Sequence, residues 1–181
     1  MNIADEGMQY KSQLYELYEM AFPEQEKKPL HVMEQLVEDG KMEMLAMVDG
    51  DEFVGLAINM LSGNCALLDY YAIMPEKRSG GYGSKGLEVL LVCFKNQKYI
   101  FEIEIQDEQA DNAQERKRRK AFYLRNGLKE TGLFANVYDT DFEILTPDGE
   151  LTFQEYMDFL KEVLGEEYVD FLNPTLLSET K

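Results

Sequence analysis

The first forty residues carry apolar side chains at intervals of three and four, which is the spacing of an amphipathic helix. A helix is predicted over residues 10–21. It is expected to end at Phe22, because the residue before Pro23 avoids the helical region of backbone space. A second helix is predicted over residues 29–38, since proline stands in its first turn and Gly40 follows its end. The apolar positions of the first helix are Leu14, Tyr15, Leu17, Tyr18 and Ala21.

After residue 42 the apolar runs become typical of strands. Strands are predicted over residues 43–48, 53–61 and 66–74. An Asp-Gly pair at 49–50 separates the first two strands, and a Ser-Gly-Asn turn at 62–64 separates the second and third. Such turn residues between apolar runs indicate hairpins, so the three strands are expected to form an antiparallel meander.

The middle of the chain predicts a crossover. A glycine-rich loop follows Pro75, a helix with an apolar face is predicted over residues 82–96, and a strand is predicted over residues 99–106. A strand, a helix and a second strand in this order require a parallel pair of strands. The sheet is therefore expected to be mixed.

The last third of the chain predicts helices and two further strands. The elements are a helix over residues 111–125, strands over 133–138 and 142–145, a helix over 152–164 and a short turn over 169–172. Thr152 and Glu155 stand three residues apart, as in a capping box. The tail, residues 178–181, is expected to be loose. The pattern indicates one α+β domain, residues 1–181, with a core over about 10–146 and a C-terminal helical extension over about 150–173.

Composition narrows the class of protein. With 45% hydrophobic and 29% charged residues, a chain of 181 residues can bury a core and is not expected to be disordered. No run of eighteen apolar residues is present, and the first residues lack a basic start followed by an apolar run. We therefore expect a cytoplasmic protein without a membrane partner. Cys65 and Cys93 have apolar neighbours, so two buried thiols are expected rather than a disulfide.

The charge of the chain excludes some partners. A net charge of −17 repels nucleic acid and anionic membranes and attracts cationic amines, although acidity also simply keeps a protein in solution. The one basic run, residues 116–120, covers all sides of a helix and is expected to pair with nearby acids. His31 is the only histidine, and it is expected to be a structural or surface residue near the start of a helix. No metal site is expected, because clusters of histidine or cysteine are missing.

The glycine-rich loop Arg78-Ser79-Gly80-Gly81-Tyr82-Gly83 is suited to hold a pyrophosphate. Its backbone N–H groups and the positive end of the following helix converge on one hollow, and glycine lets an anion approach the backbone closely. A P-loop would need Gly-Lys-Ser or Gly-Lys-Thr, whereas the chain has Gly83-Ser84-Lys85. A Rossmann loop would follow a first parallel strand rather than a meander. Taken alone, the loop is equally compatible with a plain strand-to-helix turn.

Two motifs together resemble a known family. A strand ends in Ile73-Met74-Pro75, and the spacing R-x-x-G-x-G follows from Arg78 to Gly83. About forty residues later the pair Phe122-Tyr123 precedes Asn126-Gly127-Leu128. This combination resembles the GNAT family of N-acetyltransferases over residues from about 10 to 145. The resemblance implies a mixed, mostly antiparallel central sheet with a splayed parallel strand pair, flanked by helices, and it leaves the C-terminal helical extension unexplained.

The resemblance also implies acetyl-CoA as co-substrate. In such a protein the strand backbone before Pro75 pairs with the pantetheine arm, the loop N–H groups hold the pyrophosphate, and the splay between the strands over 66–74 and 99–106 opens the site. The implied cofactor-binding residues are Tyr71, Ala72, Ile73, Arg78, Ser79, Gly80, Gly81, Tyr82, Gly83 and Ser84.

Three side chains are candidates for catalysis. Tyr123 matches the family tyrosine that faces the cofactor sulfur and donates a proton to the thiolate, and the alternative is a core aromatic residue. Glu102 and Glu104 alternate with apolar residues, so they share one face of a strand and are candidates for the general base, with Glu102 ahead. The alternative is that both carboxylates lie on a solvent-exposed face of the strand and have no catalytic role. The chain departs from the family it resembles at Arg116, where many members of that family carry an asparagine, and the nearest asparagine is Asn112.

The predicted activity is transfer of an acetyl group from acetyl-CoA to a primary amine by direct attack in a ternary complex. A small amine, a polyamine, an aminoglycoside or a protein N-terminus would each fit as acceptor. The alternative is a non-catalytic acyl-CoA-binding module or sensor, and a further one is a domain that has lost the cofactor. Dimers are common among relatives, so a homodimer stays open.

Overall fold

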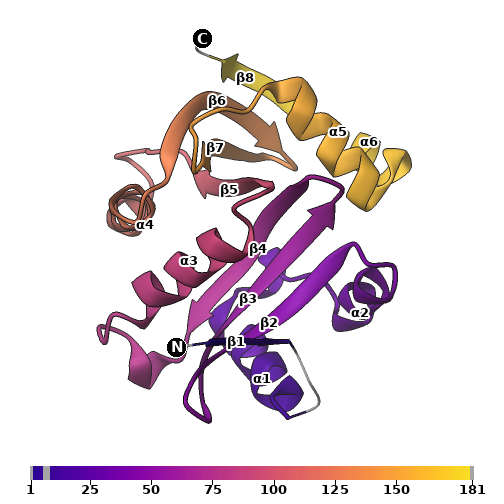
Figure 1. Cartoon of the computed structure of the whole chain (residues 1–181). Helices are drawn as coiled ribbons and strands as arrows, with labels where there is room; N and C mark the ends of the chain where they lie inside the picture. Colours follow the sequence, from indigo (N-terminus) through magenta and orange to yellow (C-terminus); the bar gives the residue numbers. More distant parts are fainter. Residues whose placement is uncertain (1, 6–8, 180–181) are drawn as a thin grey trace. The chain divides into compact units, whose positions relative to one another are not determined.

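The computed structural model describes residues 2–5 and 9–179 (Figure 1). Its backbone contacts divide the chain into two compact units. Unit 1 comprises Met1–Leu61 and Leu68–Lys95, and unit 2 comprises Ser62–Leu67 and Asn96–Lys181. The assignment of residues 1–181 to one domain stays a prediction.

Unit 1 contains the predicted meander with one additional strand. β2 (Met42–Asp49) pairs antiparallel with β3 (Glu52–Ser62), with a β-bulge between Met47 and Val48. β4 (Cys65–Ile73) follows β3 in the strand order, and only its residues from Leu68 on belong to unit 1. The additional strand is β1 (Asn2–Asp5), which pairs antiparallel with the outer edge of β2. Four residues are too few to show an alternating pattern, so the sequence did not reveal β1.

The helices of unit 1 bury part of the predicted apolar positions. α1 (Lys11–Ala21) buries Leu14, Leu17 and Tyr18, whereas Tyr15 and Ala21 are half-buried, and α2 (Leu30–Glu38) buries Met33. α3 (Tyr82–Cys93) buries Gly86, Leu87 and Leu90 and ends three residues before the predicted boundary. Two short 3-10 helices complete the unit, η1 (Glu24–Glu26) and η2 (Pro75–Lys77).

The connection between α1 and α2 is fixed to β4. The buried Tyr70 hydroxyl donates to the Glu26 carbonyl at 2.7 Å and accepts from the Lys28 backbone N–H at 3.1 Å. The Lys28 ammonium lies 2.8 Å from both carboxylate oxygens of Asp69. These bonds satisfy polar groups that a loop would otherwise leave unpaired.

Unit 2 contains the parallel strand pair. Cys65, Ala66 and Leu67 of β4 pair in parallel with Lys98, Tyr99 and Ile100 of β5 (Lys98–Glu104). The remaining neighbours are antiparallel: β5 with β7 (Thr140–Thr146), β7 with β6 (Lys129–Val137), and β6 with β8 (Thr175–Glu179). The predicted class, an α+β fold with a mixed, mostly antiparallel sheet, is therefore confirmed.

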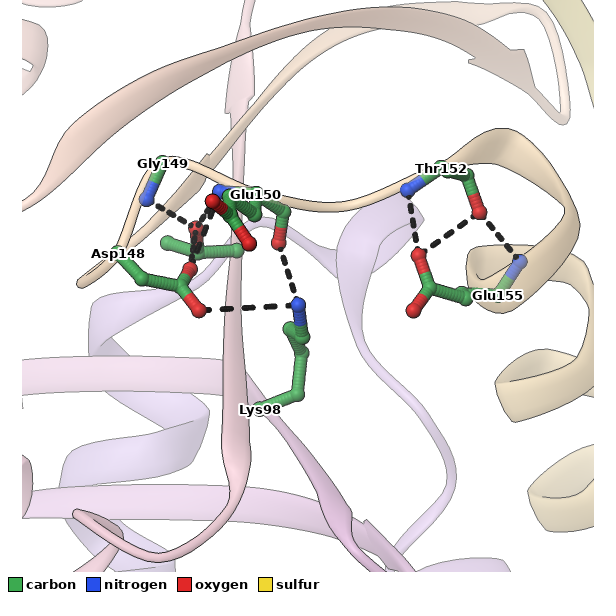
Figure 2. Close-up of polar contacts among 7 residues, drawn as sticks. Lys98, Asp148, Gly149, Glu150, Thr152 and Glu155 are labelled. Carbon is green, nitrogen blue, oxygen red and sulfur yellow. Dashed lines mark hydrogen bonds and ion pairs between the residues drawn. The ribbon is translucent and has the colours of Figure 1, made fainter.

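Three helices accompany these strands: α4 (Ala113–Arg125), α5 (Phe153–Leu164) and α6 (Glu166–Leu172). The predicted capping box is confirmed. The Thr152 hydroxyl accepts from the Glu155 N–H at 3.2 Å, and the Glu155 carboxylate accepts from the Thr152 N–H at 2.8 Å, as Figure 2 shows. The buried residues of α5 are Tyr156, Phe159, Leu160 and Val163.

Two expectations are corrected. The tail was expected to be loose, but Ser178 and Glu179 pair with β6, because the open edge of β6 supplies backbone partners that no side-chain pattern reveals; residues 180–181 lie outside the described part. Both cysteines are free, as expected, yet Cys93 is exposed and Cys65 only half-buried. Cys93 lies next to the exposed Val92, so its apolar neighbours in sequence do not cover it.

His31 is exposed in the first turn of α2, as expected. Within residues 2–5 and 9–179, no helix is long and apolar enough to cross a membrane.

Candidate functional site

The glycine-rich loop of unit 1 adopts an open conformation before α3. Ser79 and Gly81 have φ angles of 66° and 80°, in the left-handed region, and between them the Gly80 N–H donates to the Lys77 carbonyl at 3.4 Å. Gly81 is the N-cap of α3, and no side chain of the described residues caps this helix end. The first N–H groups of a helix have no partner within the helix, so this end can bind an anion.

Three side chains hold this loop in place. The Tyr71 hydroxyl donates to the Gly83 carbonyl at 2.6 Å, and Arg78 Nε donates to the Ile73 carbonyl at 3.2 Å. The Tyr82 hydroxyl donates to Asp49 Oδ2 at 3.0 Å, and this bond raises the pKa of Tyr82. Predicted cofactor residues of β4 and of the loop are thus brought together within unit 1.

A residue that sequence reasoning missed lies against β4. A Cβ atom on Gly55 of β3 would stand 2.4 Å from the Ala72 carbonyl oxygen and 2.9 Å from Ile73 Cδ1. Real Cβ atoms do not approach other atoms this closely, so only glycine fits here. The available signal was a glycine within a strand, which often marks a close approach of another backbone.

Tyr123 lies near the C-terminal end of α4 in unit 2. Its ring packs on Phe101 of β5 at 5.4 Å between ring centroids. Burial raises the pKa of Tyr123 to about 12, and the nearby charge of Arg119 opposes this shift. Among the described residues its hydroxyl has no hydrogen-bond partner, and every buried side-chain oxygen or nitrogen has one, so this hydroxyl reaches the surface. A phenol of this kind keeps its proton at neutral pH and is available to a ligand.

Glu102 and Glu104 of β5 are bound by different helices. Glu104 accepts hydrogen bonds from Asn112 at 3.2 Å and forms ion pairs with Arg116 at 2.7 Å and Arg119 at 3.3 Å, all on or next to α4. Glu102 instead accepts a hydrogen bond from the Tyr156 hydroxyl of α5. The Glu104 carboxylate is therefore engaged by three donors, Asn112, Arg116 and Arg119.

Arg116 stands where the family resemblance led us to expect an asparagine. Its Nε donates to Asn112 Oδ1 at 2.7 Å, and its Nη1 donates to the Ile105 carbonyl at 2.9 Å. Asn112 is therefore engaged in the Glu104 network. The basic run pairs with acids as expected, and the further pairs are Lys117 with Glu108, Arg118 with Glu115, and Lys120 with Glu130 and Glu143.

A hollow of about 860 Å³ lies in unit 1 beside α1 and the turn between β2 and β3. Its apolar lining residues are Leu17, Met20, Phe53 and Met74. Carboxylates also line the hollow, which favours cations over anions there. They are Glu16, Asp49, Asp51, Glu52 and Glu76.

Comparisons with known proteins identify the family and the fold of the chain. The model described as the acetyltransferase (GNAT) family matches residues 11–127, which is more than half of the chain. A sequence search of curated proteins gives no match.

Solved structures share the fold. A GNAT-family protein from Bacteroides thetaiotaomicron is 21% identical, with 92% of this chain and 99% of that chain covered and a TM-score of 0.73. The ribosomal-protein-S18-alanine N-acetyltransferase from Escherichia coli is 18% identical, with 83% and 95% covered and a TM-score of 0.58. A GNAT family acetyltransferase from Elizabethkingia anophelis with acetyl-CoA bound is 14% identical, with 64% and 80% covered and a TM-score of 0.50. At these identities the likeness shows the fold alone.

Proposed function

Because the chain belongs to the acetyltransferase (GNAT) family and is therefore an acyltransferase, we propose that it transfers the acetyl group of acetyl-CoA to a primary amine. The family assignment made from the two motifs is confirmed. The observation that carries the proposal is the uncapped N-terminus of α3, which follows a loop with two left-handed residues.

The loop and the strand before it fit acetyl-CoA. The N–H groups at the start of α3, at Tyr82, Gly83 and Ser84, would hold the pyrophosphate, and Gly81 has no atom within 4 Å of the place where a Cβ would project. Arg78 is exposed and adds a positive charge at the rim. The backbone of Tyr71, Ala72 and Ile73 would hold the pantetheine arm in the manner of an added strand. Ser79 and Gly80 complete the loop.

The transfer joins the amine nitrogen to the acetyl carbonyl carbon and breaks the bond from that carbon to sulfur. N–H groups of the strand near Ile73 polarise the carbonyl, the nitrogen loses one proton to a base, and sulfur gains one proton. We assign the base to Glu102, because Glu104 is held by two guanidinium groups and an amide. We assign the donor to Tyr123, whose hydroxyl has no partner among the described residues. A pKa of about 12 makes Tyr123 a weak acid, so its contribution is expected at the low end for general acids.

The acceptor is proposed to be cationic. The net charge of −17 and the carboxylate-lined hollow of unit 1 both favour amines. The alanine N-acetyltransferase with a similar fold acts on an amine as well. Small amines, polyamines, aminoglycosides and peptide N-termini form the panel to be tested.

The first experiment is calorimetric titration with acetyl-CoA. Gly81→Asp places a carboxylate and a strained side chain at the loop, and Gly40→Asp is the matched control. Both glycines have positive φ angles, 80° and 68°, both are exposed, and neither has an atom near its would-be Cβ. We expect the wild type and Gly40→Asp to bind and Gly81→Asp to lose binding.

Equal binding by both variants would remove the loop from the site. If folded wild type bound acetyl-CoA but acetylated no amine in the panel, the chain would be a binding module or sensor. Absence of binding would refute acetyl-CoA as the co-substrate.

A further inference from the structure

The family match ends at residue 127, and the chain beyond it adds α5, which brings a tyrosine to the assigned base. We propose that Tyr156 is a positioning residue for Glu102, so that the C-terminal extension takes part in catalysis through one hydrogen bond. The proposal rests on the proposed function and on Glu102 as the base. It gives a role to a segment that the family resemblance leaves unexplained.

The start of α5 is fixed to the strand that carries Glu102. Lys98, the first residue of β5, donates to the Glu150 carbonyl at 2.9 Å and lies 3.7 Å from Asp148 (Figure 2). Thr146, the last residue of β7, accepts from the Gly149 N–H at 2.9 Å and donates to Asp148 at 2.8 Å. Two residues after Glu150 the capping box begins α5, so the direction of this helix is set at its first turn.

Tyr156 reaches Glu102 from within the core of unit 2. Its side chain is 0% exposed, and its hydroxyl donates to Glu102 Oε1. A buried phenol needs a hydrogen-bond partner, and here the partner is the assigned base. Burial, followed by the charge of Glu102, raises the pKa of Tyr156 well above its ordinary value, so Tyr156 remains a donor at any working pH.

This bond has two consequences for Glu102. It fixes Oε1 and therefore the plane of the carboxylate, so the direction of Oε2 is set in advance of substrate binding. It also stabilises the charged form, because the donor pairs with a carboxylate better than with a carboxylic acid. The other charged groups on the same face of β5 are Lys98, which is bound to Glu150 and Asp148, and Glu104, which is held by Arg116 and Arg119 of α4. On β7 the residue opposite Glu102 is the uncharged Ile144.

A purely structural role would give a different result. If Tyr156 only held α5 in place, its hydroxyl would affect stability and leave catalysis unchanged. The pH dependence of kcat/KM separates these cases, because the loss of a helix contact that did not involve Glu102 would leave the ionisation of the base unchanged.

The experiment compares wild type, Tyr156→Phe, Glu102→Gln and Phe159→Leu, with saturating acetyl-CoA and the best amine of the panel. Phe159→Leu is the control, since Phe159 lies on the same helix and is similarly buried, at 2% exposed. For Tyr156→Phe we expect a roughly tenfold lower kcat with unchanged affinity for acetyl-CoA. We also expect the acidic limb of its profile to move upward by about one pH unit, which corresponds to a tenfold change in an ionisation constant. Phe159→Leu should keep the wild-type profile.

A wild-type profile and wild-type kcat in Tyr156→Phe would overturn the inference while leaving the proposed function intact. Full turnover by Glu102→Gln would overturn the base assignment and the inference with it. If Tyr156→Phe failed to fold, Glu102→Asp, which withdraws the carboxylate from Tyr156 by one methylene, should show the same displaced limb.

A readout without turnover tests the contact itself. Titration of the Glu102 carboxyl by carbon-13 NMR, assigned with Glu102→Gln, should give a higher midpoint in Tyr156→Phe than in the wild type. Identical midpoints would overturn the inference even if no acceptor had been found. Loss of acetyl-CoA binding by the wild type would instead refute the proposed function.

Discussion

Gly55 is the position at which one added methyl group should most disturb β4, the strand proposed to hold the pantetheine arm. In Gly55→Ala the new Cβ would lie 2.4 Å from the Ala72 carbonyl oxygen and 2.6 Å from Met47 Cε. Met47 can rotate away. The Ala72 oxygen belongs to the backbone of β4, so it can move only if the strand moves, and two residues later the Met74 N–H donates to the Val54 carbonyl at 3.0 Å.

The expected cost follows from this geometry. Overpacking a well-packed core costs typically about 1–3 kcal/mol, and we expect the upper end because the obstructing atom is backbone. Gly50→Ala is the matched control in unit 1, since nothing lies within 4 Å of its would-be Cβ. Its cost is only that of a non-glycine residue at a φ of 64°, roughly 1 kcal/mol.

Urea denaturation followed by fluorescence or circular dichroism gives both free energies of unfolding. We expect Gly55→Ala to lose about 2 kcal/mol more than Gly50→Ala and to bind acetyl-CoA more weakly, because Ala72 is proposed to hold the pantetheine arm. If the two variants lost equal stability, the close approach of β3 and β4 at this point would be refuted. Lost stability with wild-type affinity would remove Ala72 from the binding site.

Two further predictions concern unit 2. Tyr123→Phe should lower kcat roughly 10- to 100-fold and leave the calorimetric affinity for acetyl-CoA unchanged; wild-type turnover at every pH would exclude Tyr123 as the proton donor. Lys120→Met should lower the free energy of unfolding by about 3 kcal/mol at pH 7, because it leaves the buried Glu143 carboxylate without its cation. Burial raises the pKa of Glu143 in the folded state, so the folded state binds this proton more tightly than the unfolded chain does. Protonation of Glu143 therefore stabilises the folded state, and this stabilisation is lost as pH rises through the folded-state pKa and regained as pH falls. The loss of unfolding free energy in Lys120→Met should accordingly be smaller at pH 5 than at pH 7. Lys117→Met, which breaks an exposed pair with Glu108, is the control with almost no loss at either pH, and a Lys120→Met deficit that did not vary with pH would contradict this account.

Local signals in the sequence were enough to predict most of the helices and strands. The Asp-Gly turn, the proline-ended third strand and the Thr152 capping box each depend on interactions within a few residues, and the structure has them where the sequence predicts them. The positive φ of Gly81 likewise agrees with the glycine pattern of the loop.

What the sequence did not reveal depends on residues far apart in the chain. β1 and β8 are edge strands of four and five residues that exist because β2 and β6 offer them backbone partners. Alternation predicts that Glu102 and Glu104 share one face of their strand, but it does not predict that Tyr156, 54 residues away, binds Glu102. The sequence pattern also does not predict that Arg116 and Arg119 bind Glu104.

The strand order of unit 2 has a consequence for how this chain emerges during synthesis. All residues of unit 1 precede residue 96, whereas β5 ends at Glu104 and its antiparallel partner β7 begins only at Thr140. Until β7 has left the ribosome, one edge of β5 presents unpaired backbone groups beside the apolar side chains of Phe101 and Ile103. A nascent chain paused within α4 would therefore carry a finished first unit and a strand edge open to other chains, which makes this interval the point where chaperone binding matters most.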